Sequence, residues 1–300
     1  MLYLLLTVVL NAYLLVAFKV FERYKVDNLQ AIVANYWVCV LTGSVFIGRF
    51  PVGRESVSQP WALWSLVMGA AFIGIFNLIA YCTKEDGVTT TTIANKLGMV
   101  IPVAFAIWLY GEKLSLPKSL GILLAAPAVY LSSRTKDEPE KRRNLWLAAL
   151  LFIASGLLDT LVNYVARQYF STGDPEVDER GQSVYLVHAF SAATLIGTAI
   201  VSYLLIRGKR QFAWKNIMAG IALGVPNFFS IYFLLRLLQT GFLPGSAAIP
   251  VNNIGIVLLA SLTAILFFKE KAGAARIIGM ILSVAAIVLI MLSDLHGNTP

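Results

Sequence analysis

Long apolar blocks separated by short polar segments fill almost the whole of this 300-residue chain. A helix needs about 20 mainly apolar residues to cross a bilayer. Ten blocks have roughly this length, and we place them at residues 2–21, 30–48, 61–83, 89–110, 117–133, 145–170, 183–206, 215–239, 245–268 and 272–293. The pattern predicts an all-α membrane protein with ten transmembrane helices.

The composition supports this fold class. Hydrophobic residues make up 58% of the chain and charged residues only 13%, whereas soluble domains carry about 25% charged residues. The mean hydropathy of +0.75 would give a soluble protein more exposed apolar surface than water tolerates. Cys39 and Cys82 lie inside apolar blocks without a CxxC motif, so we expect two buried thiols.

The sequence divides into two similar units. The polar stretch RTKDEPEKRRN, residues 134–144, lies between two mainly apolar units. We place the first unit at residues 1–137, a charged linker at 138–144 and the second unit at 145–300. The fourth block and its exit read NKLGMVIPVAFAIWLYGEKL from Asn95, and the ninth read NNIGIVLLASLTAILFFKEKA from Asn252. A Gly and an Asn spaced by three residues also recur, at Gly74 and Asn77 and again at Gly224 and Asn227.

Five helices in each unit make the second unit enter the membrane in the opposite sense. The sequence therefore predicts two inverted five-helix repeats, a plan on which many secondary transporters are built. Two near-equivalent halves can exchange conformations and so move an opening from one membrane face to the other. The alternative is a duplicated helical bundle without a transport role.

Basic residues predict the orientation. Numbered in order, the odd inter-helix loops carry 16 Lys and Arg residues and the even loops carry 7. Because basic loops stay in the cytoplasm, we expect the odd loops in the cytoplasm and both termini outside, in a bacterial plasma (inner) membrane. The net charge of +8 is then a topology signal, and we expect no nucleic-acid partner.

The five-plus-five plan, with Gly-Glu-Lys at 111–113 and Lys-Glu-Lys at 269–271, resembles the drug/metabolite transporter superfamily and within it the EamA-like family. The resemblance covers about residues 2–293. It implies a central cavity lined by helices one, three and four of each half, with each fifth helix at the periphery. The second half has Leu259 where the first has Pro102, so we do not expect both halves to bend alike.

Two charged residues, Lys96 and Asp159, lie well inside the predicted helices. A charge at the bilayer centre costs about 2.5–3.5 kcal/mol on insertion scales, so it needs a cavity or a partner. Lys96 is a candidate for attracting a carboxylate or phosphate, or for acting as a counter-charge; the alternative is snorkelling to the interface. Asn253 stands at the matching place in the second half.

Asp159 is a candidate for proton exchange or for binding a substrate amine, and Asn163 shares its helix face. The alternatives are a static salt bridge to Lys96 or a hydrogen bond to a neighbouring helix. The hypothesis to test is that Lys96 and Asp159 face one cavity. Further candidates for the cavity wall are neutral residues: Asn11, Asn77, Tyr81, Asn95, Trp108, Asn163, Asn227, Tyr232, Asn252 and Asn253. Helix bends are expected at Gly98, Pro102, Pro226 and Pro250.

The sequence has no HExxH motif, nucleophile elbow, P-loop or glycine-rich nucleotide loop, so we expect no enzyme, cofactor or metal. The leading hypothesis is a secondary transporter in the lipid bilayer, exporting a small polar metabolite such as an amino acid, with protons as a candidate coupling ion. One alternative is a transporter of nucleotide-sugars, sugar-phosphates or lipid-linked sugars. A non-transporting scaffold or a membrane enzyme is another. The sequence leaves monomer and homodimer open.

Overall fold

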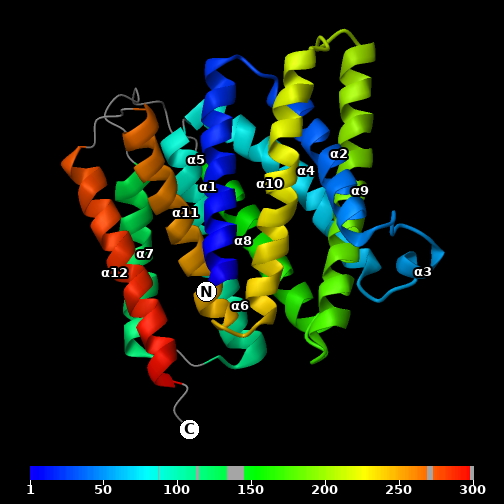
Figure 1. The fold of residues 1–300 in the computed structure, drawn as a ribbon. Helices are drawn as coiled ribbons and strands as arrows, with labels where there is room; N and C mark the ends of the chain where they lie inside the picture. Colours follow the sequence, from blue (N-terminus) through cyan, green and yellow to red (C-terminus); the bar gives the residue numbers. More distant parts are fainter. Residues whose placement is uncertain (87, 113–114, 134–144, 269–272, 298–300) are drawn as a thin grey trace.

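The computed structural model describes residues 1–86, 88–112, 115–133, 145–268 and 273–297, and these residues form helices and loops with no strand among them (Figure 1). The helices are α1 (Leu2–Arg23), α2 (Asn28–Ile47), α3 (Arg54–Val57), α4 (Ala62–Asp86), α5 (Val88–Leu97), α6 (Val100–Tyr110), α7 (Leu116–Ser133), α8 (Leu145–Tyr169), α9 (Pro175–Ile206), α10 (Trp214–Gln239), α11 (Gly245–Phe268) and α12 (Ala274–Gly297).

The all-α fold class is confirmed for these residues. By length and composition, eight helical stretches could cross a membrane, and two shorter apolar helices, Leu2–Phe18 and Leu116–Leu131, accompany them. Both cysteines are buried and free, as expected. The predicted linker 138–144 and the Glu-Lys exit residues Lys113, Glu270 and Lys271 lie outside the described residues.

One predicted helix is broken in two, between α5 and α6. Pro102 has no N–H, so it cannot donate to the Gly98 carbonyl as a helix interior requires. Instead, the Ile101 N–H donates to the Gly98 carbonyl at 2.9 Å, and the Met99 N–H donates to the Lys96 carbonyl at 3.3 Å. Both bonds span three residues, as in a tight 3₁₀ turn, and they leave Lys96 at the end of α5.

The second half is not interrupted in the same way. The helix α10 continues through Pro226, and α11 continues through Pro250. In α11 the place of Pro102 is taken by Leu259, whose N–H can join the helix ladder. The two halves therefore differ in the helix that carries the candidate site.

The helix α9 begins at Pro175, eight residues before the predicted residue 183. Asp174 caps this helix by accepting hydrogen bonds from the N–H groups of Glu176 and Val177. Pro175 lies in the first turn, where its fixed φ is favourable. The first two turns, PEVDERGQ, are polar. The apolar pattern of the sequence therefore did not predict these two turns.

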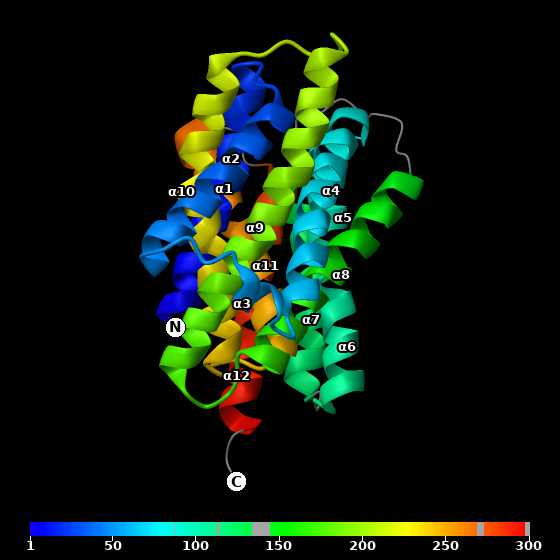
Figure 2. The same cartoon turned by 90° about the vertical axis from the view of Figure 1, so that its right-hand side faces the viewer.

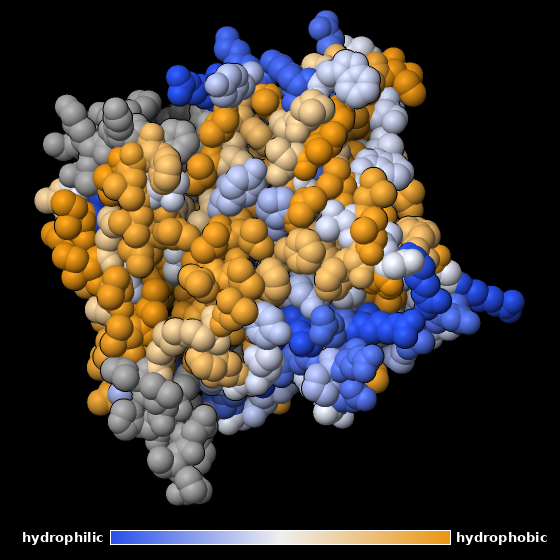
Figure 3. All heavy atoms as spheres, in the orientation of Figure 1, coloured by the Kyte–Doolittle hydropathy of each residue, from blue (hydrophilic) through white to orange (hydrophobic). Residues whose placement is uncertain are grey.

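The bundle has two ends, which we name by one residue each. The Asp27 end carries the loops 24–27 and 207–213, and the Glu112 end carries the loops 170–174 and 240–244 (Figure 1). The start of α1 and the end of α12 both lie toward the Glu112 end (Figure 1). Apolar side chains cover the middle of the face drawn in Figure 3, and hydrophilic side chains gather toward its edges.

The helix α9 packs between α2 and α4, α2 also packs on α10, and α7 pairs with α12 (Figures 1 and 2). Two of these contacts have the same geometry. A Cβ added to Gly69 of α4 would lie 2.4 Å from the Ala189 carbonyl oxygen of α9, and one added to Gly220 of α10 would lie 2.3 Å from the Ala31 carbonyl oxygen of α2. Glycine lets the backbones of both pairs approach closely.

Two glycines that match in spacing have different surroundings. Gly74 and Gly224 match in spacing, but a Cβ on Gly74 would meet nothing within 4 Å, whereas one on Gly224 would lie 2.3 Å from Val38 Cβ. Gly69 and Gly220 instead have similar surroundings. Spacing alone could not show this, because it contains no information on which face of a helix is covered.

Candidate functional site

Lys96, Asn253 and Asp159 come from three helices and form one polar chain. Lys96 Nζ, at the end of α5, donates a hydrogen bond to Asn253 Oδ1 of α11 at 3.3 Å. Asn253 Nδ2 in turn donates to Asp159 Oδ2 of α8 at 3.0 Å. Asn253 is buried, and the two charged residues are half-buried. A cation and an anion are thus joined through one amide.

Close backbone packing brings these helices together. A Cβ on Gly98 would lie 2.9 Å from both the Gly156 nitrogen and the Phe152 carbonyl oxygen of α8. A Cβ on Gly156 would lie 2.6 Å from the Gly98 carbonyl oxygen. Any larger residue at either position would push α8 away from the α5–α6 break and so separate Asp159 from Lys96.

Unpaired polar atoms lie on the same helices. Ser155 Oγ, one turn before Asp159, and Asn252 Oδ1, next to Asn253, are buried and have no hydrogen-bond partner within the described residues. Lys96 also lies in the last turn of α5, where the helix dipole favours a cation. Because an unpaired buried polar atom is costly, a polar ligand or water that bonded Ser155 or Asn252 would be stabilised.

Asn163 belongs to a second cluster at the Glu112 end. Its Oδ1 accepts a hydrogen bond from Arg167 Nε at 3.1 Å. Arg167 also forms an ion pair with Glu112, and its guanidinium lies 4.4 Å from the centre of the Tyr110 ring. Sequence spacing correctly put Asn163 on the face of Asp159, but it did not reveal that the amide contacts Arg167.

Two other predicted residues take part in helix contacts away from the Lys96 chain. Asn227 Nδ2 donates to Cys39 Sγ at 3.6 Å across the α2–α10 contact. The Tyr232 hydroxyl donates to Glu179, which also pairs with Arg236 at 3.2 Å, so this group joins α9 to α10.

Asn11 and Asn77 bond to their own helices. Asn11 Nδ2 donates to the Thr7 carbonyl at 2.9 Å, and Asn77 Nδ2 donates to the Ile73 carbonyl at 2.6 Å. Asn95, beside Lys96, is half-buried.

Two aromatic candidates are exposed at the bundle surface. Trp108 is 79% exposed and Tyr81 is 53% exposed. Trp108 contacts Phe105 of the same helix, ring edge to ring face. An exposed tryptophan near a helix end is typical of the membrane interface.

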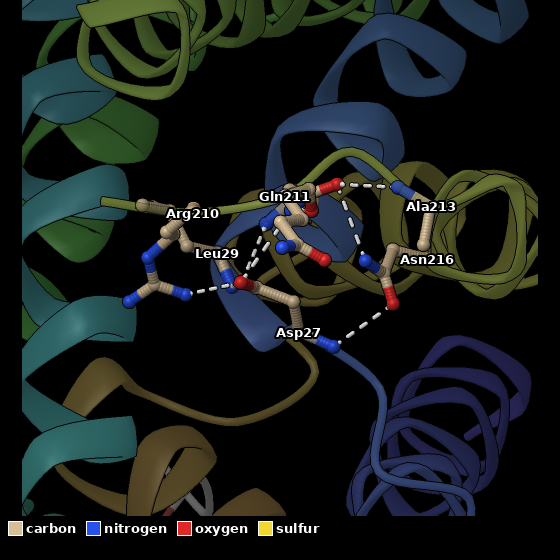
Figure 4. Close-up of polar contacts among 7 residues, drawn as sticks. Asp27, Leu29, Arg210, Gln211, Ala213 and Asn216 are labelled. Atoms are coloured by element: carbon tan, nitrogen blue, oxygen red, sulfur yellow. Dashed lines mark hydrogen bonds and ion pairs between the residues drawn. The ribbon is translucent and has the colours of Figure 1, made fainter. Parts of the chain in front are cut away.

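The Asp27 end has its own polar network (Figure 4). Asp27 caps α2 by accepting a hydrogen bond from the Leu29 N–H at 3.0 Å and forms an ion pair with Arg210. The Asp27 N–H donates to Asn216 Oδ1 at 2.9 Å, and Gln30 Nε2 donates to the Gln211 carbonyl at 2.8 Å. This network ties α2 to the loop before α10.

Within the described residues, no group of three or more His, Cys, Asp or Glu side chains could hold a metal ion. The polar groups of the Lys96 chain are amide, ammonium and carboxylate, which bind organic solutes by hydrogen bonds and charge.

Comparison with known families now adds to this picture. The model of the EamA-like transporter family matches residues 1–134. This match confirms the predicted resemblance to the drug/metabolite transporter superfamily, and together with the apolar helices it supports an integral multi-pass membrane protein. The EamA-like unit includes α1 to α7, and therefore Lys96 and the α5–α6 break.

Two further comparisons cover the whole chain. A crystal structure of another protein aligns over 99% of this chain and 98% of that chain, with a TM-score of 0.73 and 15% identity. An uncharacterized protein of Haemophilus influenzae is 23% identical over 289 residues, which is 93% of this chain and 94% of that protein. The fold thus extends beyond the EamA-like unit into the second half.

Proposed function

We propose that the protein is a secondary transporter that moves a small polar metabolite across the bacterial plasma membrane by alternating access. The observation that carries this proposal is the chain from Lys96 through Asn253 to Asp159. Charged side chains inside a membrane are costly and face an interior path or a partner. Here the cation comes from the EamA-like unit and the anion from the second half, so both halves contribute to one site.

The solute we propose is zwitterionic, such as an amino acid, and the direction is export. A substrate carboxylate would replace Asn253 Oδ1 as the partner of Lys96. A substrate ammonium would replace Asn253 Nδ2 as the partner of Asp159. Protonation of Asp159 would release that ammonium, which makes a proton the proposed coupling ion. Phosphate-bearing sugars are less favoured because a phosphate usually attracts several basic groups.

Alternating access rests on two inverted five-helix repeats, which we propose for residues 1–137 and 145–300. Two observations support them. The contact of Gly69 with α9 has the same geometry as that of Gly220 with α2. Gly98 packs on α8 as its counterpart Gly255 packs on Val8 of α1, where an added Cβ would lie 3.1 Å from Val8 Cγ2.

The test is transport by the purified protein. A thermal-shift screen against metabolites first identifies a stabilising solute, and proteoliposome uptake of that solute is then measured with an imposed pH gradient. Lys96→Met and Asp159→Asn should abolish uptake, and Asp159→Asn should also remove its pH dependence. Matched controls are Lys209→Met and Asp174→Asn, which change the same residue types in exposed loops. Wild-type rates and pH dependence in both site variants would overturn the proposal.

A further inference from the structure

Glu112 joins three helices at one end of the bundle. It follows Gly111, which ends α6 with a left-handed φ of 62° and turns the chain toward α8 and α11. One carboxylate oxygen of Glu112 pairs with Arg167 near the end of α8. The other accepts hydrogen bonds from the hydroxyl and, at 3.2 Å, from the N–H of Ser246 in the first turn of α11. The negative charge is also favourable at that helix N-terminus.

The same helices carry the Lys96 chain. Arg167 follows Asp159 by eight residues on α8, with Asn163 midway between them, so the three share one face. Ser246 precedes Asn253 on α11 by seven residues, which is about two helical turns. The Glu112 contacts therefore fix the spacing of α8 and α11 two turns away from Asp159 and Asn253.

We propose that Glu112 is a latch that closes the Glu112 end of the bundle in one of the two states of the transporter. The latch consists of Glu112, Arg167 and Ser246. When it opens, the ends of α6, α8 and α11 separate, and the Lys96 chain becomes accessible from that end. This inference rests on the proposed function, because a latch has a role only if the site must open to one face at a time.

Two features make the contact reversible. The side chains of Glu112 and Arg167 keep 12% and 27% of their exposure, so water can solvate both when they part. The break at Gly98 and Met99 also separates α6 from α5. Consequently α6 can move with Glu112 while Lys96 stays in place on α5, as expected of a hinge formed by a few residues between rigid helices.

The experiment measures access to the site and needs no substrate. A cysteine is placed at Ser155, which precedes Asp159 by one turn and lies farther from the latch, in a background with Cys39→Ala and Cys82→Ala. Membrane vesicles of both orientations are treated with a small membrane-impermeant thiol reagent. A cysteine at the exposed residue Ser171 identifies the vesicles in which the Glu112 end faces the reagent.

Glu112→Gln should raise the labelling rate of the cysteine at position 155 from the Glu112 end by about tenfold, the ratio expected if the open state is a minor state of about 10%. Arg167→Gln should act in the same direction and serves as the second variant if Glu112→Gln does not fold. The control is Glu179→Gln, which breaks an ion pair at the same end that joins α9 to α10. It should leave the labelling rate unchanged.

An unchanged rate in both Glu112→Gln and Arg167→Gln would overturn the latch, and so would an equal rise in Glu179→Gln, because the effect would then be a general loosening. The proposed function fails separately. If the wild-type protein transports no solute but the latch variants still increase labelling, the gated opening stands and the transport proposal does not. If the wild-type protein transports a solute but neither latch variant changes the labelling rate, the transport proposal stands and the latch proposal fails.

Discussion

Lys96 and Asp159 are held on opposite sides of a single amide: Asn253 accepts a hydrogen bond from the Lys96 ammonium at 3.3 Å and donates one to the Asp159 carboxylate at 3.0 Å. The amide dipole therefore points its oxygen at the cation and its nitrogen at the anion. Within the described residues each charge has one of these hydrogen bonds and capacity for more, since an ammonium has three donors and a carboxylate about four acceptor positions. The proposed binding of a solute would use this spare capacity.

Removing the amide should destabilise the protein. Asn253→Ala deletes two hydrogen bonds to charged groups, each of which is worth about 1.5–3 kcal/mol, so the unfolding temperature in detergent should fall. Asn252→Ala is the matched control, because Asn252 Oδ1 has no hydrogen-bond partner within the described residues. A fall as large in Asn252→Ala as in Asn253→Ala would contradict the bridging role of Asn253.

Removing one of the two charges should destabilise the protein more than removing both. Lys96→Met leaves the Asp159 carboxylate without its counter-charge, and Asp159→Asn leaves the ammonium in the same position, whereas the double variant leaves neither. Uncompensated charges in a low-dielectric interior are strongly unfavourable, and neutral replacements of a pair are tolerated. Thermal unfolding should therefore place the double variant above both single variants. Additive losses would show that the two charges do not interact.

The sequence predicted the helices well because a bilayer imposes a length of about 20 apolar residues on each of them. It also anticipated the α5–α6 break, since Gly98 and Pro102 both weaken a helix. It did not predict which polar residues meet. Asn163 was expected to act with Asp159 but contacts Arg167, and Glu112 served only as a repeat landmark. Contacts between helices depend on how the helices cross and rotate, which a one-dimensional pattern does not contain.

The helix contacts at Gly69 and Gly220 offer a third prediction. Gly220→Ala places a Cβ 2.3 Å from the Ala31 carbonyl oxygen, so α10 must move away from α2, and overpacking of this kind costs about 1–3 kcal/mol. Gly69→Ala should have a similar effect on the α4–α9 contact. Gly74→Ala is the control, because its Cβ meets nothing within 4 Å and alanine is the better helix former. We expect lower unfolding temperatures for the first two variants and an equal or higher one for the third.

The direction of the chain across the membrane gives the last prediction. The odd loops carry 16 Lys and Arg residues against 7 in the even loops, and the loop 207–213 at the Asp27 end contains three of the 16. Because translocating basic loops is unfavourable, the Asp27 end should face the cytoplasm and the Glu112 end the outside. A reporter active only in the cytoplasm should be inactive when fused after Pro300 and active when fused after Phe212, where truncation leaves the chain at the Asp27 end. The opposite pair of results would reverse the orientation, and with it the side to which the Glu112 latch opens.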